Sequence, residues 1–420
     1  MGYVELGFKP EPEKYVITTL YFEPSMTLRK AAEAVAAESS VGTWTKVATS
    51  SPALAKRLGA KVFRLKKKGK GGVMKVAYPV ELFEPGNIPQ LLSDVAGNIF
   101  GMKDVKNLRL EDVEFPKGYL RSFEGPVWGV EGVRRYCGTQ KSRRPHVGTI
   151  VKPKVGLSPK KTAQVAYEAW SGGLDLVKDD ENLSSQKFCP FNERVVRVLD
   201  AMDRARSETG EKKIYTPNIT GTYGQMVERA EFVKAHGGNF IMVDVMTCGF
   251  SALQSIRGEG ILPIHGHRAM HAAITKNPRH GITMKVVAKL ARMAGCDQLH
   301  IGAAVGKMEG GAEEVHENFL ACNNEMGGLK KTFAVASGGL HPAKIYGVYN
   351  ALGSKDFVFQ AGGGVHGHPG GTLAGAKAMR QAAEAVAKNI PLKEYAKGHP
   401  ELAEAIKKWG GGKEYYAHVK

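Results

Sequence analysis

The sequence has little of what marks secreted, membrane-bound or zinc-binding proteins. Its 420 residues include only five cysteines, which are scattered and form no CxxC pair. No apolar run reaches the length of a transmembrane helix. The N-terminus is polar and interrupted by prolines, unlike a signal peptide. We therefore expect a cytoplasmic protein with free thiols and no membrane partner.

Acidic residues are fewer than basic ones: 59 Lys and Arg against 41 Asp and Glu give a net charge of +18. Such an excess serves nucleic-acid binding, an anionic substrate or simply solubility. The densest basic run, residues 64–70, lies between two strand-like segments and lacks interleaved aromatic residues. We interpret it as a solvated hairpin tip, expect no nucleic-acid partner, and expect substitutions there to leave catalysis largely intact.

Residues 1–125 predict a smaller α+β domain. Strand-like and helical segments alternate in the order β-α-β-β-α-β, which is typical of the ferredoxin-like fold. Thr27 is placed to cap the first helix. The predicted segments are strands at 15–22 and 43–48, helices at 27–37 and 88–99, a hairpin around 61–78, and a strand at 108–115.

Residues 126–405 show a different pattern, and 406–420 predict a C-terminal tail. Eight short apolar or β-branched runs alternate with helical segments such as the one opened by Ser158 and Pro159. Eight strand–helix units predict a catalytic (β/α)₈ TIM barrel in a chain of the α/β class. The expected strands are 147–152, 174–178, 213–219, 240–245, 262–265, 298–301, 332–336 and 357–360.

The second expected strand ends in Lys178-Asp179-Asp180-Glu181. Taken alone, such a run is most often a surface turn with a lysine–carboxylate pair. However, Asp180 and Glu181 supply the hard oxygen ligands that Mg²⁺ prefers. A neutral Lys178 amine can also react with CO₂ to form a carbamate, which supplies a third anionic oxygen ligand.

The other chemically suggestive residues fall at the same end of the predicted barrel, where the active sites of this fold lie. Glycine-rich loops after the last two strands predict a phosphate site. Arg268 and His300 together predict a second one. The strand ends carry Lys152 and Lys154, His265, His267 and Arg268, His300 with the loop to Lys307, Ser337 to Gly339, and Gly362 to Gly364.

Specific motifs in these segments resemble the large subunit of ribulose-1,5-bisphosphate carboxylase/oxygenase, RuBisCO. The resemblance covers nearly the whole chain in the same order, and the NLRLEDVEFP and HGHRAMH segments are most similar to the archaeal-type form III enzymes. The motifs are GGLDLVKDDE, TIVKPKVG, HGHRAMH, GAAVGKMEG, VASGGLHP and QAGGGVHGHP, with AAESSVGTWT and AGNIFGMK in the first domain.

The resemblance implies a Mg²⁺-dependent enolisation and carboxylation of ribulose 1,5-bisphosphate to two 3-phosphoglycerate, with O₂ as a competing substrate. An activator CO₂ would carbamylate Lys178. The carbamate, Asp180 and Glu181 would then hold Mg²⁺, whereas Asp179 would not be a ligand.

The same resemblance assigns roles to further positions. Lys152 would act in acid–base catalysis, His267 in hydration and proton transfer, and Lys307 at the incoming CO₂. Lys154 would hold the substrate, and Ser337 would bond a substrate hydroxyl. Arg268 and His300 would bind one phosphate. The other phosphate would be bound by Gly339, Gly362, Gly363, Thr43 and Trp44, and Gly338 and Gln360 would be additional substrate-binding positions.

Glu38, Thr43, Trp44 and Asn98 match family positions that reach the active site of a partner subunit, with Glu38 counted as catalytic. The resemblance therefore implies a homodimer with shared active sites, which can assemble into a ring of dimers, and we expect no small subunit. Nucleotide salvage is the favoured pathway.

Three alternative functions, each of a different class, are compared with the carboxylase. A barrel metallohydrolase would use a carbamylated lysine with His265 and His267, but it leaves both phosphate pockets unexplained. A RuBisCO-like enolase or isomerase of another phosphorylated sugar would keep the fold and change the reaction. A non-enzymatic basic binding protein would not need lysines, carboxylates and glycines at one barrel end.

Overall fold

The computed structural model describes residues 2–42, 45, 47–305 and 311–410, which form two compact units. One unit comprises Met1–Glu124 with Met270–Ala294 and Glu325–Leu329, and the other comprises the remaining segments. The domain limits predicted at 125 and 405 remain a prediction, although residues 406–409 belong to a helix. Within the described ranges, no helix has both the length and the apolar character to cross a membrane.

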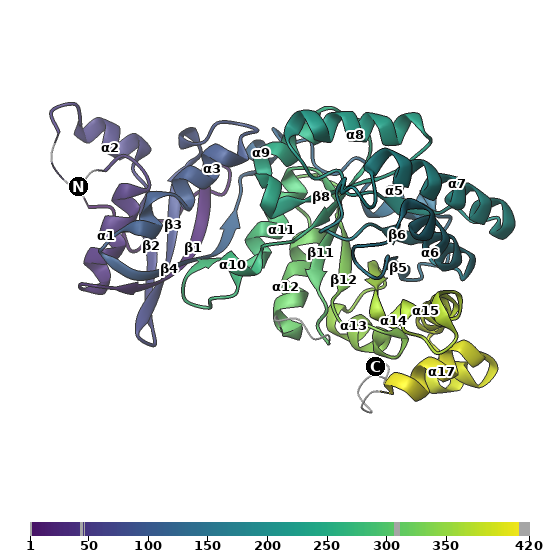
Figure 1. Ribbon diagram of the computed structural model, residues 1–420. Coiled ribbons are helices and arrows are strands. Elements are labelled where there is room, and N and C mark those ends of the chain that lie inside the picture. Colours follow the sequence, from purple (N-terminus) through teal and green to yellow (C-terminus); the bar gives the residue numbers. More distant parts are fainter. Residues whose placement is uncertain (1, 43–44, 46, 306–310, 411–420) are drawn as a thin grey trace. The chain divides into compact units, whose positions relative to one another are not determined.

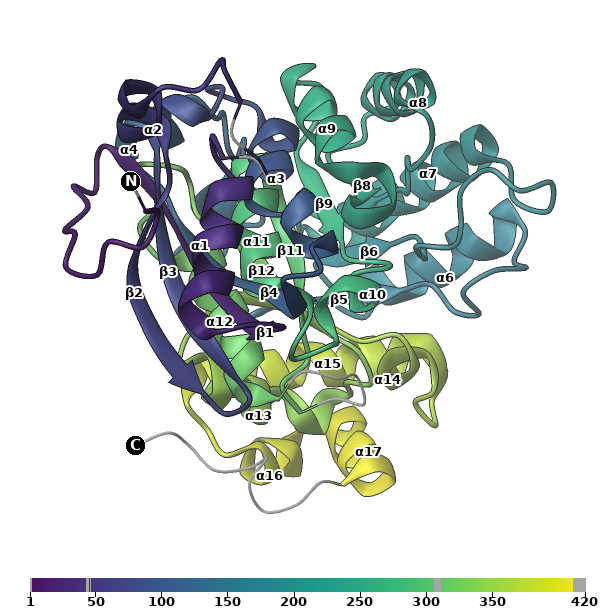
Figure 2. The ribbon, with the colours of Figure 1, turned by 90° about the vertical axis from the view of Figure 1, so that its left-hand side faces the viewer.

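The first unit is built on a five-stranded sheet in the order β10-β4-β1-β3-β2. The central strand β1 pairs antiparallel with β3 and β4, and β10 joins β4 in parallel. Helix α1 packs on this sheet (Figure 2) and buries one face through Ala31, Ala32, Val35 and Ala36. The ferredoxin-like prediction is thereby confirmed. Its strands are β1 (Tyr15–Pro24), β2 (Lys61–Lys68), β3 (Gly71–Pro79), β4 (Val105–Glu114) and β10 (Gly281–Ile282).

The helices of this unit depart from the predicted segments at two places. Asn87 caps α3, which ends near Gly97, where a Cβ atom would lie 1.9 Å from the Ser93 carbonyl oxygen. The predicted helix 88–99 is therefore interrupted before a short 3-10 turn, Asn98–Gly101. The helices are α1 (Leu28–Glu38), α2 (Pro52–Leu58), α3 (Ile88–Val95), α4 (Lys117–Leu120), α10 (Ala272–Thr275) and α11 (Met284–Met293).

The strand predicted at 43–48 is wrong in its described part, since Thr45, Val47 and Ala48 are not in a strand. Residues 43, 44 and 46 lie outside the described residues. Instead, helix α2 begins shortly afterwards, with the Ser51 side chain accepting from the Leu54 N–H and a proline at its first position. Thr27 does occupy the N-cap of α1, but its side chain makes no capping hydrogen bond.

The second unit contains the predicted barrel. Eight parallel strands follow one another in the order β7-β6-β5-β13-β12-β11-β9-β8, and a bridge between Asn218 and Met242 joins the two ends (Figure 1). All eight predicted strands are confirmed. They are β5 (His146–Ile150), β6 (Leu176–Lys178), β7 (Ile214–Thr216), β8 (Ile241–Asp244), β9 (Ile264–His267), β11 (Cys296–Gly302), β12 (Phe333–Ser337) and β13 (Phe357–Gln360).

Helices alternate with these strands, as the sequence predicts. Ser158 accepts from the Lys161 N–H at the start of α6, with Pro159 at the first helical position. The helices are α5 (Gly129–Tyr136), α6 (Pro159–Ser171), α7 (Phe191–Thr209), α8 (Tyr223–Ala235), α9 (Val245–Gly258), α12 (Ala312–Asn323), α13 (Ile345–Leu352), α14 (Gly363–His366), α15 (Gly371–Lys388), α16 (Leu392–Tyr395) and α17 (Pro400–Trp409).

The two ends of the barrel differ in chemistry. Val130 and Val133 of α5 form an apolar cluster with residues near the amino ends of several strands, among them Leu176, Ile214 and Phe333. Lysine, carboxylate, histidine and serine side chains instead occupy the carboxyl ends. Apolar packing therefore closes one end of the barrel, and the other is left for chemistry.

Candidate active site

Lys178 is the last residue of β6, and its side chain is fully buried at the carboxyl end of the barrel. Its Nζ donates to the Asp179 carbonyl oxygen at 2.8 Å, while Glu181 Oε2 lies 3.4 Å away. Burial lowers the pKa of Lys178, and the negative charges of Glu181, Asp180 and Asp244 only oppose that shift. Burial thus makes the neutral form of this amine more accessible than in an exposed lysine.

Asp180 and Glu181 flank this amine and meet groups from other strands. Lys152, just after β5, donates from Nζ to Asp180 Oδ2 at 2.7 Å. His267, at the end of β9, lies 3.6 Å from Glu181 Oε2 through Nε2. Burial alone would raise the pKa of Glu181, but Lys178 and His267 lower it to about 2. Glu181 is therefore an ionised carboxylate at neutral pH.

Asp179 faces away from this cluster. Its fully buried carboxylate accepts from Arg194 Nε at 3.1 Å, from the Tyr215 hydroxyl at 2.9 Å and from the Asn218 N–H at 3.0 Å. These bonds occupy both oxygens, which fits the expectation that Asp179 is not a metal ligand. Its task is to anchor the turn that presents its two neighbours.

His267 and His300 pack edge to face, and the His300 ring is buried. The two rings lie 4.6 Å apart at 69°. His267 Nδ1 lies 3.3 Å from Asp244 Oδ1 at the end of β8. Burial and the Lys178 charge lower the pKa of His267, partly offset by Asp244 and Glu181. His300 uses both ring nitrogens, bonding His265 through Nε2 and Ser337 through Nδ1.

Arg268 is a buried cation ready for an anion. Its side chain is only 7% exposed, yet it makes no hydrogen bond or ion pair with another described residue. Burial lowers its pKa to about 10, against the opposing charge of Glu314. Gly302 makes room for it, since a Cβ there would lie 3.2 Å from Arg268 Nη2. A phosphate beside Arg268 would supply the missing partner.

The glycine loops after β12 and β13 stand next to these side chains. Gly338 and Gly339 have φ values of 114° and 70°, which side-chain-bearing residues rarely adopt. A Cβ on Gly362 would lie 2.8 Å from Lys152 Cε, whereas Gly363 has open space. Neither amide atom of buried Gln360 finds a partner among the described residues. These loops leave backbone N–H groups and an amide free for a ligand.

The remaining predicted site residues are either exposed or outside the described residues. Lys154 is exposed and donates to Asn182 Oδ1 at 3.2 Å. Glu38, at the end of α1, and Asn98, in the 3-10 turn, are both exposed. Thr43, Trp44 and Lys307 lie outside the described residues.

The sequence did not point to several residues that shape the site. Asp244, Gln298 and Met242 are missing from the predicted set, and His265, although noted at a strand end, has no predicted role outside the hydrolase alternative. That alternative loses its metal ligand, because both ring nitrogens of His265 are engaged by Gln298 and His300. An acid ending a strand was a usable signal for Asp244. The other three are recognisable only from their partners on other strands.

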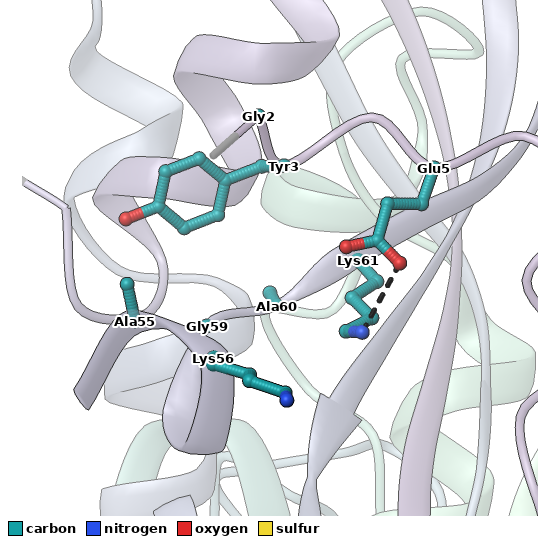
Figure 3. Close-up of a pocket in the computed structure, with 8 residues that line it drawn as sticks. All are labelled: Gly2, Tyr3, Glu5, Ala55, Lys56, Gly59, Ala60 and Lys61. Carbon is teal, nitrogen blue, oxygen red and sulfur yellow. Dashed lines mark hydrogen bonds and ion pairs between the residues drawn. The ribbon is translucent and has the colours of Figure 1, made fainter. Parts of the chain in front are cut away.

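A separate hollow lies in the first unit (Figure 3). Its cavity volume is about 180 Å³, and Lys61 and Glu5 form an ion pair of 3.1 Å in its wall. It shares no residue with the predicted active site. The lining consists of Gly2, Tyr3, Glu5, Ala55, Lys56, Gly59, Ala60 and Lys61.

Comparison with known families agrees with the geometry over nearly the whole chain. Residues 130–409 match the catalytic domain of the ribulose bisphosphate carboxylase large chain, and residues 2–119 match its N-terminal domain. The chain belongs to the RuBisCO large-chain family. The lysines, carboxylates and glycine loops described above therefore lie in the barrel of a member of this family, whose named relatives are ribulose bisphosphate carboxylases.

Individual RuBisCO relatives are similar throughout. A ribulose bisphosphate carboxylase of Pyrococcus furiosus is 50% identical over 98% of this chain and 97% of its own length. A ribulose bisphosphate carboxylase of Methanosarcina barkeri is 48% identical over 97% of this chain and 98% of its own length. These relatives confirm the prediction of an archaeal-type member.

Solved RuBisCO structures are equally close. The octameric enzyme of Pyrococcus horikoshii matches with a TM-score of 0.92 and 48% identity, covering 97% of this chain and 96% of its own. The dimeric archaeal enzyme of Hyperthermus butylicus matches with a TM-score of 0.89 and 45% identity, covering 97% and 98%.

Proposed function

We propose that this RuBisCO catalyses the Mg²⁺-dependent carboxylation of ribulose 1,5-bisphosphate, yielding two molecules of 3-phosphoglycerate, with O₂ as a competing substrate. The observation that carries the proposal is the fully buried Lys178 amine, which has the Glu181 carboxylate at 3.4 Å and is influenced by the charges of Asp180 and Asp244. No common structural role requires a fully buried lysine with its nearest carboxylate oxygen at 3.4 Å.

A carbamate on Lys178 explains this arrangement. The neutral amine attacks CO₂ and its nitrogen releases one proton to solvent, so that an anionic carbamate replaces the uncharged amine near Asp180 and Glu181. Among the described residues, no three His, Cys, Asp or Glu side chains are grouped to hold a metal ion. Asp180 and Glu181 fit Mg²⁺ as hard oxygen donors, and the carbamate is the third donor that they lack.

Bound Mg²⁺ supplies Lewis-acid stabilisation of negative charge on adjacent substrate oxygens. The protein side chains orient the sugar and move protons. Lys152, held 2.7 Å from Asp180, carries a proton at Nζ within reach of the site. His267, between Asp244 and Glu181, is a second proton carrier.

The two phosphates of the substrate would be bound at different sides of the barrel mouth. Arg268 offers a buried guanidinium without a partner. The loops with Gly338, Gly339, Gly362 and Gly363 offer backbone N–H groups. Lys154, Ser337 and Gln360 would contact the sugar between them, and Lys307 would approach the incoming CO₂.

We further propose a homodimer, with or without assembly into a ring, and without a small subunit. Exposed Glu38 and Asn98, together with Thr43 and Trp44, would complete the active site of a partner subunit. Dimeric and octameric relatives of this kind exist. Nucleotide salvage in the cytoplasm is the setting we propose for the reaction.

The proposal is tested by fixation of labelled CO₂ after preincubation with bicarbonate and Mg²⁺. We expect activity to require the preincubation and to vanish in Lys178→Met, which keeps the length of the buried side chain. Lys213→Met is the matched control, because Lys213 is also fully buried but lies at the opposite end of the barrel, paired with Glu211 at 2.7 Å. Full activity of Lys178→Met would refute the carbamate.

A further inference from the structure

Four side chains form a continuous hydrogen-bonded row inside the barrel. Gln298 Oε1 lies 2.7 Å from His265 Nδ1, His265 Nε2 lies 2.9 Å from His300 Nε2, and His300 Nδ1 lies 2.6 Å from Ser337 Oγ. Gln298, His265 and His300 are all buried. The row therefore runs from the barrel interior to the substrate side, where Ser337 ends β12.

The carbonyl oxygen of Gln298, at the inner end of the row, determines which atom donates in each of the three hydrogen bonds. The carbonyl oxygen of Gln298 only accepts, so His265 must carry its proton on Nδ1. A neutral His265 then accepts at Nε2, which requires the proton of His300 to sit on its Nε2. His300 Nδ1 in turn accepts from the hydroxyl of Ser337.

This reasoning requires that both histidines are neutral, and their surroundings keep them so. Burial lowers the pKa of His265 to about 3 and that of His300 well below its ordinary value. Lys178 and the neighbouring rings act in the same direction on both. Each ring therefore has one N–H at neutral pH, and one proton arrangement satisfies all three bonds.

The rings are also held in place against rotation. His265 packs edge-on against His300 at 4.9 Å, and His267 packs edge-on against His300 at 4.6 Å. Reversal of the row would require the amide of Gln298 to turn, both imidazoles to change tautomer and the hydroxyl of Ser337 to rotate. The orientation of the Gln298 amide, with Oε1 toward His265, therefore selects one of the two directions.

We propose that Gln298 and His265 are positioning residues of this RuBisCO, which hold the Ser337 proton toward His300 and so present the Ser337 oxygen to the substrate as a hydrogen-bond acceptor. The inference deepens the proposed function, on which it rests, by naming what Ser337 recognises: a hydroxyl group that donates. Neither Gln298 nor His265 touches the substrate, and both act through His300 and Ser337.

Neutron diffraction of deuterium-exchanged crystals tests the direction without needing activity. We expect deuterons on Nδ1 of His265 and Nε2 of His300, with the Ser337 deuteron on the line to His300. An amide of Gln298 that donates to His265, or deuterons on the opposite nitrogens, would overturn the proposal. Because this readout requires only the folded protein, it remains decisive even if the protein fixes no CO₂.

Kinetics of two variants test the consequence. Gln298→Glu places a carboxylate beside His265 Nδ1 and favours the doubly protonated ring, whose Nε2 then donates to His300 and reverses the row, so KM for the sugar bisphosphate should rise. Gln298→Met removes the acceptor, opens both directions and should raise KM by about three- to tenfold with little change in kcat, since a substrate hydrogen bond is weakened. Gln381→Met, which breaks bonds between α15 and α17, is the control and should change neither.

A merely structural role of Gln298 would lower the amount of active enzyme, and therefore kcat, in both variants without moving KM. Unchanged KM in both Gln298→Met and Gln298→Glu would overturn the proposal.

Discussion

At the scale of the residue, two fully buried lysines show how surroundings decide a role. Lys213 has a carboxylate oxygen of Glu211 at 2.7 Å and the Leu174 carbonyl at 3.2 Å, as expected of a structural ion pair. Lys178 has its nearest carboxylate oxygen at 3.4 Å and the thioether sulfur of Met242 at 3.5 Å. Lys213 therefore has a structural role, whereas the Lys178 amine lacks a close carboxylate partner and remains available to react.

A pH dependence of stability belongs to the same scale. His146 is buried, and its burial lowers its pKa from the ordinary value of 6.5 to about 3. Between these values the unfolded chain binds a proton that the folded chain does not. Stability contributed by His146 is therefore present above pH 6.5 and is lost as the pH falls toward 3.

We expect the free energy of unfolding to fall by about 2–3 kcal/mol on account of His146 when the pH drops from about 6.5 to about 4.5. His146→Gln keeps a polar atom near Thr139 and removes the titration. Denaturant unfolding of both proteins at several pH values should show that the free energy of unfolding falls less steeply with decreasing pH in the variant than in wild type. Equal slopes would contradict the expectation.

At the scale of the element, the loop after β13 depends on one glycine more than on its neighbour. A Cβ on Gly364 would lie 2.2 Å from the Leu340 carbonyl oxygen and 2.6 Å from His341 Cα, both backbone atoms of the loop after β12. A Cβ on Gly363 would meet nothing within 4 Å. The two adjacent positions therefore form a matched pair.

Gly364→Ala should lower the free energy of unfolding by about 1–3 kcal/mol, because backbone must shift to relieve the clash. Gly363→Ala should change it by less than about 1 kcal/mol. Denaturant midpoints of the two variants and wild type decide the matter. A Gly364→Ala variant as stable as Gly363→Ala would show that the two glycine loops are not closely packed.

The barrel strands could be predicted because they are short apolar or β-branched runs that alternate with helical segments, and most of them end in chemically distinctive residues. Helix α2 could not be predicted as easily, since its seven residues bury no side chain and carry no apolar face. Only the Ser51-Pro52 start signals it. The predicted strand at 43–48 rested on composition alone.

The active site divides in the same way. Lys178, Asp180 and His267 could be predicted from the sequence, because their residue types are unusual at the end of an apolar strand. Gln298 and Met242 do not, because a buried amide and a buried thioether acquire a role only through partners on neighbouring strands. Residue type therefore identifies the reacting groups, and the fold is needed to identify the groups that orient them.

At the scale of the whole molecule, the proposed sharing of active sites between subunits of a homodimer can be tested by complementation. Glu38→Gln and Lys178→Met should each inactivate the enzyme alone, through residues that would come from different subunits of one site. Mixed dimers would contain one doubly altered site and one intact site. Random mixing of equal amounts should restore about a quarter of wild-type activity.

The control for that experiment is a pair of changes within the barrel, Lys152→Met with Lys178→Met, which leaves no intact site in any dimer. Activity of the Glu38→Gln and Lys178→Met mixture no higher than that of this pair would contradict sharing of the site between subunits.

Carboxylation itself is tested most directly by the products formed from ribulose 1,5-bisphosphate and ¹³CO₂ under activating conditions. The account predicts equal amounts of labelled and unlabelled 3-phosphoglycerate, because one carboxylate carbon per substrate comes from CO₂. An unlabelled isomer of the starting sugar bisphosphate, with no 3-phosphoglycerate, would contradict it and would indicate an enolase or isomerase built on the same barrel.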